Sequence, residues 1–221
     1  MSYIFIEDHV VPQIFTSAIE AYEILHKKPK GKGTDKLETF GLLWGYSIQA
    51  KGNQEQKIIV TMAKVETSAT RHNEWVSPDF KSLCMKKEFL ENYWPNIELV
   101  GSFHSHPYKD LTEVTENTGW QASKQVNNKK GDEQFFPYFH QEVAPEQENL
   151  VHLIVTITHL RRNYNSKPSR LANHESSRGY VLSAKKRRIW LRAYRTISTD
   201  DSYEFKDDCI LEIPSLQPRF S

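Results

Sequence analysis

The sequence has few cysteines and no long apolar run. Its 221 residues include only Cys84 and Cys209, and neither belongs to a C-x-x-C motif. This excludes a disulfide framework and gives no sign of a cysteine-based zinc site or redox pair. The most apolar segment, 150–157, is too short to cross a bilayer, and the start MSYIFIEDHV lacks the regions of a signal peptide. We therefore expect a cytoplasmic protein with two free thiols.

Neither sign of charge dominates. The chain has 29 Lys and Arg against 28 Asp and Glu, so a net charge of +1 gives no global attraction to nucleic acid or to anionic lipid. The segment 185–195 does mix basic and aromatic residues, as nucleic-acid surfaces do. Strand alternation, however, would bury positions 189, 191 and 193 and turn Trp190, Arg192 and Tyr194 outward. We interpret this segment as a solvated strand face and expect neither a nucleic-acid nor a membrane partner.

The composition and the apolar spacing predict one α+β domain over residues 1–221. Hydrophobic residues make up 38% and charged residues 26%, which is typical of soluble globular proteins. Residue spacing predicts helices over 12–26, 77–94 and 112–125, a helical run opened by Asp132, and strands over 40–49, 57–66, 97–103, 150–158, 180–184, 188–194 and 209–213. Segments 27–36 and 161–178 are predicted to be loops. Strands and helices follow no regular cadence, which favours a mixed sheet between helices.

Two histidines lie at the end of a predicted strand. In the segment G-S-F-H-S-H-P, His104 and His106 are two positions apart, so a strand directs both imidazoles to one face and Ser105 to the other. We expect Pro107 to end the strand, because it lacks a backbone donor. Imidazole is a zinc ligand, and a catalytic zinc has three protein ligands and one open position. An H-x-H pair alone is equally compatible with a hydrogen-bonded strand end.

A glutamate precedes the first predicted core strand. In E-T-F-G-L-L-W-G, Glu38 comes two residues before the run that begins at Phe40. Gly41 and Gly45 would allow a neighbouring backbone or a substrate to approach closely. Taken alone, a glutamate at this position is ordinarily an exposed residue at the end of a strand.

Taken together, E-x-x-G-L-L-x-G, an intervening strand and helix, and G-S-F-H-S-H-P resemble the JAB/MPN metallopeptidase family, known for its JAMM motif. The resemblance spans about residues 12–158 and points to the bacterial deubiquitinase-like branch. It implies a mixed β-sheet with helices on both sides and one Zn²⁺ per chain. It also implies that His104 and His106 are ligands, that Glu38 is the general base on the attacking water, and that an aspartate is the third ligand.

The chain departs from the family pattern after Pro107. The family has S-x-x-D about six residues later, where its serine helps to polarise the scissile carbonyl and its aspartate binds zinc. This chain instead has E-V-T-E at 113–116. We favour an insertion over 112–131, with Asp132 as the third ligand and Ser123 in the role of the serine, because Asp132 lies 18 residues before Leu150, close to the family interval. The alternatives are Glu116 or Glu113 as ligand, with Thr112 or Thr115 assisting, and a plain helix N-cap role for Asp132.

The resemblance implies a substrate class as well. Relatives of this branch act on the C-terminal tail or the isopeptide bond of a ubiquitin-like protein, in settings that include bacterial conjugation and antiviral defence operons. We therefore expect a zinc peptidase with a ubiquitin-like substrate and conjugation enzymes as further partners. The alternative is a non-catalytic MPN-like scaffold, which the missing S-x-x-D keeps open.

Overall fold

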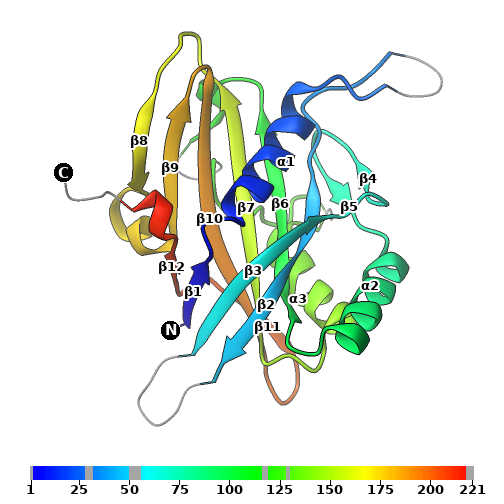
Figure 1. The fold of residues 1–221 in the computed structure, drawn as a ribbon. Helices are drawn as coiled ribbons and strands as arrows, with labels where there is room; N and C mark the ends of the chain where they lie inside the picture. Colours follow the sequence, from blue (N-terminus) through cyan, green and yellow to red (C-terminus); the bar gives the residue numbers. More distant parts are fainter. Residues whose placement is uncertain (1, 28–31, 50–55, 116–118, 128–129, 218–221) are drawn as a thin grey trace.

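One curled mixed sheet organises the chain (Figure 1). The structure, a computed structural model, describes residues 2–27, 32–49, 56–115, 119–127 and 130–217. The sheet contains β1 (Ser2–Ile6), β2 (Phe40–Ile48), β3 (Lys57–Val65), β6 (Glu98–Tyr108), β7 (Asn149–His159), β8 (Ser166–Arg170), β9 (Gly179–Ala184), β10 (Arg187–Ser198), β11 (Tyr203–Lys206) and β12 (Cys209–Glu212). Their order is β12-β1-β3-β2-β6-β7-β10-β9-β8, and β11 pairs with β10 off this path. Parallel pairs (β1 with β12, β1 with β3, β6 with β7) occur among antiparallel ones, so the predicted α+β class with a mixed sheet is confirmed.

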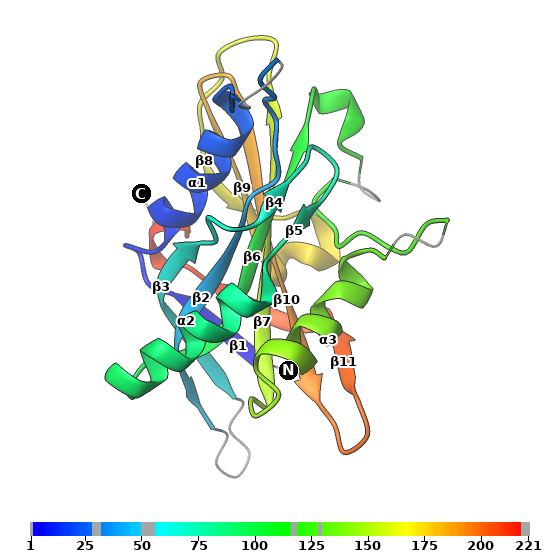
Figure 2. The ribbon, with the colours of Figure 1, turned by 90° about the vertical axis from the view of Figure 1, so that its right-hand side faces the viewer.

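Helices pack on the two faces of this sheet. Helix α1 (Val11–Glu23) lies against β3, β6 and β7, while α2 (Phe80–Tyr93) and α3 (Asp132–Val143) lie beside each other and contact β6 and β10 respectively (Figure 2). Short 3₁₀ turns occur at η1 (Leu111–Glu113), η2 (Asn173–Arg178) and η3 (Pro214–Leu216), and β4 (Thr70–Arg71) with β5 (Val76–Ser77) forms a separate small hairpin. Among the described residues, no helix combines the length and apolar character needed to cross a membrane.

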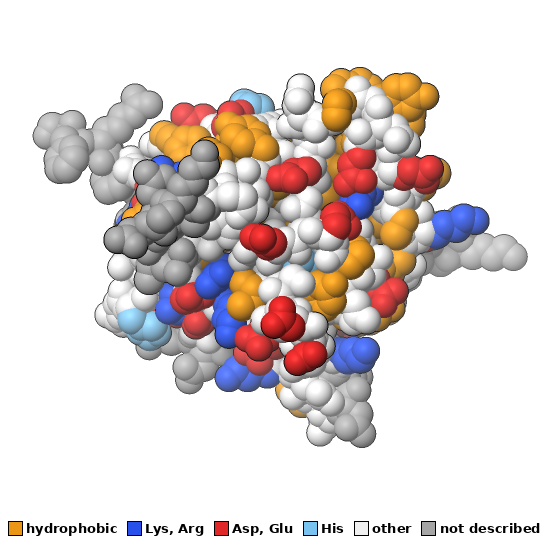
Figure 3. All heavy atoms as spheres, turned by 90° about the horizontal axis from the view of Figure 1, so that it is seen from below, with side chains coloured by type: hydrophobic (Ala, Val, Ile, Leu, Met, Phe, Trp, Pro, Cys, Tyr) orange, Lys and Arg blue, Asp and Glu red, His pale blue; other side chains and the backbone are white. Residues whose placement is uncertain are grey.

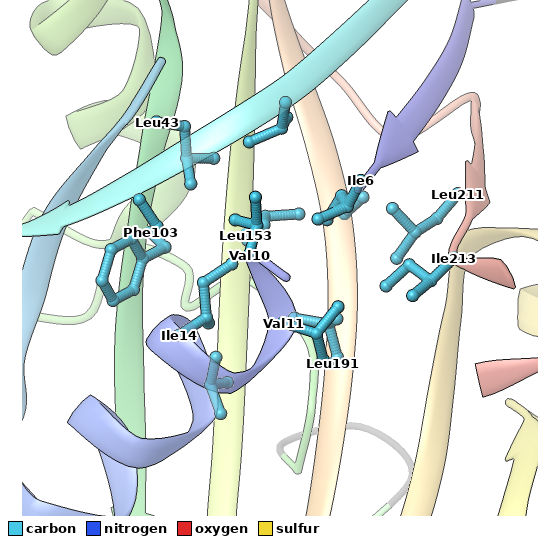
Figure 4. Close-up of a cluster of buried hydrophobic side chains, with 14 of the residues drawn as sticks. Ile6, Val10, Val11, Ile14, Leu43, Phe103, Leu153, Leu191, Leu211 and Ile213 are labelled. Carbon is cyan, nitrogen blue, oxygen red and sulfur yellow. The ribbon is translucent and has the colours of Figure 1, made fainter. Parts of the chain in front are cut away.

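Strand β2 shows why both faces are covered. Leu43 packs into the cluster around α1, where Ile14, Phe103 and Leu153 meet (Figure 4). The neighbouring positions Leu42 and Trp44 project to the opposite face and join the α2 and α3 side. Successive side chains of a strand point to opposite faces of the sheet. When all of them are apolar, each face of the sheet must be covered by an apolar layer. The run F-G-L-L-W therefore encodes a central strand rather than a half-exposed one.

The two edges of the curled sheet meet through side chains. Arg170 of β8 donates to the Leu211 carbonyl of β12 and to the Glu212 carboxylate, at 2.5 and 2.9 Å. Tyr180 accepts a hydrogen bond from the Ile213 amide at 3.2 Å. These contacts occupy polar groups that a free sheet edge would leave unpaired.

The two motif glycines lie where other parts of the sheet come close. A Cβ on Gly41 would lie 2.2 Å from the Phe103 ring, and a Cβ on Gly45 would lie 1.8 Å from the Ile59 carbonyl oxygen. Gly45 directly follows an irregularity in the register of β2 with β3. Atoms of β6 and β3 therefore occupy the space beside Gly41 and Gly45. The two glycines make room for neighbouring strands of the protein and not for a substrate.

Several predicted element boundaries are wrong. The predicted helix over 112–125 is absent from the described residues of that segment, which form η1 and then irregular structure at 119–125. Helix α2 begins at Phe80, because Asp79 rather than Ser77 caps it by accepting from the Ser82 amide at 3.0 Å. The predicted loop 161–178 contains β8 and η2, and strand β1 was not predicted.

Strand β6 also continues past the proline that was expected to end it. Pro107 and Tyr108 remain in register with Ile157 and Thr158 of β7. The Ser105 amide points to the other side, donating to the Thr39 carbonyl at 3.1 Å. Backbone nitrogens two residues apart face the same side of a strand, so the Pro107 nitrogen also faces the β2 side. At that position β2 has not yet begun, and the proline therefore removes no hydrogen bond between the strands.

Strand β10 is buried on both faces, contrary to the predicted solvated face. Trp190, Arg192 and Tyr194 are each less than 5% exposed. Trp190 stacks on Trp120, Arg192 pairs with Glu175 of η2, and Tyr194 lies in a cluster with Phe136 of α3. Segments distant in sequence thus cover a strand face that local alternation alone assigns to solvent.

Candidate metal centre

The two motif histidines project together from β6. Their Nε2 atoms lie 2.9 Å apart. Ser105, between them, points to the opposite side and accepts from the Thr39 amide at 3.0 Å. His104 is only 3% exposed, whereas His106 is partly buried at the edge of a cleft. The predicted shared direction of the two imidazoles is confirmed.

Asp132, the first residue of α3, completes the group. Its Oδ1 lies 3.1 Å from His104 Nε2, and its Oδ2 lies 3.3 Å from His106 Nε2. His104, His106 and Asp132 form the one set of three potential metal ligands found among the described residues. The preceding Gly131 caps α3, so Asp132 does not have the N-cap role that was its alternative.

The rival third ligands lie elsewhere or outside the described residues. The Glu113 carboxylate accepts from the Lys109 amide at 2.9 Å and belongs to η1. Thr112 donates to Asp110. Thr115 does not belong to the cleft lining, and Glu116 lies outside the described residues. The geometry therefore favours Asp132 over Glu113.

The three side chains fit a zinc ion in both chemistry and spacing. Zinc binds imidazole nitrogen and carboxylate oxygen at about 2.0–2.1 Å, so tetrahedral ligand atoms lie roughly 3.3–3.4 Å apart. The observed separations of 2.9, 3.1 and 3.3 Å approach those values. Two histidines and one aspartate leave a fourth position, as catalytic sites require. All three residues line the same cleft, which gives that position access from solvent.

Charge in the group is strongly coupled. Burial favours the neutral form of Asp132, but the charge of His104 and hydrogen bonds from both histidines outweigh it and hold the carboxyl pKa well below its usual range. Burial likewise opposes protonation of His106, but the hydrogen bond and negative charge of Asp132, with a smaller effect of Glu38, raise the His106 pKa. The raised pKa of His106 and the lowered pKa of Asp132 both show that the site favours positive charge beside an ionised carboxylate, and such a site is suited to a cation.

Glu38, two residues before β2, lies at the same cleft as this group. Its amide donates to the His72 carbonyl at 2.8 Å, which fixes the backbone just before the strand. The side chain is 7% exposed and lines the cleft with both histidines. Burial raises the pKa of the Glu38 carboxyl to about 8, and nearby Asp132 and Glu74 act in the same direction, against the charge of His106. Glu38 is thus not the exposed strand-end residue of the ordinary interpretation.

The cleft has a volume of about 370 Å³ and is bordered by a segment that the sequence did not single out. Residues 73–76, at the turn of the β4–β5 hairpin, form part of its wall. Trp75 stacks on His72 with ring centroids 5.4 Å apart, and its carbonyl accepts from the His72 amide at 2.9 Å. Strands of two residues are too short to give an alternation signal, so the local sequence held no usable sign of this wall.

Ser123 contacts Asp132, the candidate third ligand, and does not stand alone in the cleft. Its hydroxyl donates to Asp132 Oδ2 at 2.8 Å and accepts from the Asp132 amide at 2.9 Å. The Ser123 amide donates to the same Oδ2 at 2.7 Å. Ser123 also lines the cleft, and its assistance to a substrate carbonyl stays a prediction.

Comparison with known proteins adds no identification. No protein-family model matches the sequence, and no curated protein matches it.

Proposed function

We propose that this protein is a zinc-dependent peptidase or isopeptidase that hydrolyses the C-terminal tail or isopeptide linkage of a ubiquitin-like protein. One observation carries the proposal: His104, His106 and Asp132 converge within hydrogen-bonding distance of one another, and the buried Glu38 lines the same cleft. This is a three-ligand metal site with a carboxyl group beside its open position, in the chain order of the JAMM motif. The motif resemblance supplies the zinc and the reaction class.

The chemistry divides between the metal and the glutamate. A zinc ion held by the three ligands would supply Lewis-acid polarisation and lower the pKa of water at the site. The Glu38 carboxylate takes a proton from the attacking water and delivers it to the nitrogen of the leaving amine. A carboxyl pKa raised to about 8 makes Glu38 a stronger base than an exposed glutamate. A cation beside it lowers that pKa, as the charge of His106 does, and so favours the ionised form that a base requires.

The surface next to the cleft supports a protein substrate. Phe40 lines the cleft, and Leu42 and Trp44, the next residues on the same face of β2, line an adjoining apolar groove with Phe89 of α2. Seen from below, apolar side chains form several patches, one of them on the right-hand side, where α2 lies in Figure 1 (Figure 3). Because Leu42 and Trp44 follow Phe40 on the same face of β2, we assign the groove to the folded body of the ubiquitin-like substrate whose tail enters the cleft. Conjugation enzymes of a bacterial or antiviral defence system are the partners that this substrate implies.

Zinc-dependent cleavage tests the proposal. The purified protein is incubated with ubiquitin-like proteins that carry a C-terminal fusion, with and without a chelator. We expect cleavage at the end of the ubiquitin-like domain, its loss with chelator, and its return with added zinc. His104→Ala and His106→Ala should lose both zinc and activity. A native chain that binds no zinc would reject the peptidase and favour the non-catalytic scaffold.

A further inference from the structure

Asp132 depends for its position on a segment that crosses β7 and β10. Residues 119–123 lie outside any helix or strand, yet they are attached at several points. The Thr156 hydroxyl donates to the Gly119 carbonyl at 2.8 Å, and Trp120 stacks on Trp190 with centroids 6.1 Å apart. The segment ends at Ser123, the residue whose amide and hydroxyl both donate to Asp132 Oδ2.

The last attachment before Ser123 is a single side chain. The Ala122 amide donates to the Tyr194 hydroxyl oxygen at 2.7 Å. Tyr194 is 3% exposed, and its ring lies over the Arg192 guanidinium, 3.9 Å from the ring centroid. Arg192 is in turn paired with the buried carboxylate of Glu175. The tyrosine hydroxyl is therefore held on a rigid support on β10, and it fixes the backbone one residue before Ser123.

We propose that Tyr194 is a positioning residue for the metal site, acting through Ala122 and Ser123 on the orientation of Asp132. This inference rests on the proposed zinc site. Without the Tyr194 hydroxyl, the Ala122 amide loses its partner and Ser123 is free to shift. The Asp132 carboxylate then loses two donors that set its orientation toward His104 and His106. Groups that hydrogen-bond a metal ligand typically change metal affinity by about 10- to 100-fold when removed.

The chain offers a matched control. Tyr180 is also fully buried, and its hydroxyl also accepts a backbone amide, that of Ile213, at 3.2 Å. It belongs to the cluster around α1, on the opposite side of the sheet from Phe136 and Tyr194. Tyr180→Phe removes the same hydroxyl from the same kind of environment without touching the path to Asp132.

Zinc affinity is measured on the metal-free full chain by competition with a chromophoric chelator. Tyr194→Phe should bind zinc about tenfold more weakly than wild type, whereas Tyr180→Phe should bind it as tightly. Amide hydrogen exchange gives a second readout: the Ala122 amide should exchange slowly in the wild type and rapidly in Tyr194→Phe. Equal zinc affinity of Tyr194→Phe and wild type would overturn the inference and leave the proposed function intact.

Two further results keep the test decisive. If Tyr194→Phe does not fold, amide exchange in the wild type decides. Rapid exchange of the Ala122 amide would show that the bond to the Tyr194 hydroxyl does not hold this segment, and it would overturn the inference without any tyrosine variant. A wild-type chain that binds no zinc would overturn the proposed function and this inference together.

Discussion

Phe40 of β2 lies directly opposite His104 of β6. Continued by two residues, this antiparallel register sets Glu38 opposite His106, and the hydrogen bond from the Ser105 amide to the Thr39 carbonyl at 3.1 Å shows that the strands stay together there. Glu38, the proposed base, and His106, a proposed ligand, are therefore cross-strand neighbours. The spacing between the two motifs matters less than the pairing of the strands that carry them.

Glu38→Gln should retain zinc and lose activity. The amide keeps the size of the side chain but cannot accept a proton, and general-base catalysis typically contributes about 10²- to 10⁴-fold. We expect a loss of that order in kcat/KM on a ubiquitin-like fusion, with about one zinc per chain by elemental analysis. Full hydrolysis by the zinc-loaded variant would show that Glu38 is not the base.

Asp132→Asn should weaken zinc binding more than a substitution of any residue that only hydrogen-bonds a ligand. Removal of a ligand charge should exceed the roughly 10- to 100-fold effect of losing an outer partner. Glu113→Gln and Glu116→Gln are the matched controls, since they neutralise the rival carboxylates. Chelator competition on the three variants decides among them, and loss of zinc in either glutamate variant alone would reject Asp132 as the third ligand.

Phe89→Asp should impair hydrolysis of the protein substrate but not hydrolysis of a short peptide. Phe89 is 54% exposed and lines the apolar groove beside the cleft. Loss of an apolar anchor in an interface costs about 1.4 kcal/mol, which corresponds to about a tenfold rise in KM for the ubiquitin-like fusion. Tyr164 is a similarly exposed aromatic residue (59%) in the 161–165 segment, and Tyr164→Asp should change the KM for neither substrate. Equal kinetics of Phe89→Asp and wild type would remove the groove from the substrate path.

His152 should make the fold sensitive to acid. It is fully buried between Ser102 and Thr196 and stacks on Phe136, and burial with the charges of His140 and His104 holds its pKa well below the usual value of 6.5. Below pH 6.5 the unfolded chain binds a proton at this position and the folded chain does not, so acid favours unfolding.

Urea unfolding of the metal-free wild type and of His152→Gln from pH 7.5 to 5 measures this effect. The wild type should lose more stability than the variant below pH 6.5, by up to about 1.4 kcal/mol per pH unit. Parallel curves for the two proteins would show that His152 is protonated in the folded state.

The sequence by itself determined the features that depend on neighbours along the chain. Alternation in a strand is local, so the shared direction of His104 and His106 followed from their spacing of two. The interval from Asp132 to the strand at Leu150 favoured Asp132 as a ligand only through the resemblance to the JAB/MPN family, and the geometry favours the same residue. The apolar run from Phe40 predicted a strand for the same local reason.

Only the tertiary structure decided the rest. Alternation tells which residues of β10 share a face, but not that residues 119–123, α3 and η2 cover that face and bury Tyr194. The burial of Glu38, the wall from the β4–β5 hairpin and the link from Tyr194 to Asp132 arise where segments far apart in the sequence meet. Contacts of this kind depend on the closure of long loops and on packing of whole layers, and no local pattern of residue types records them.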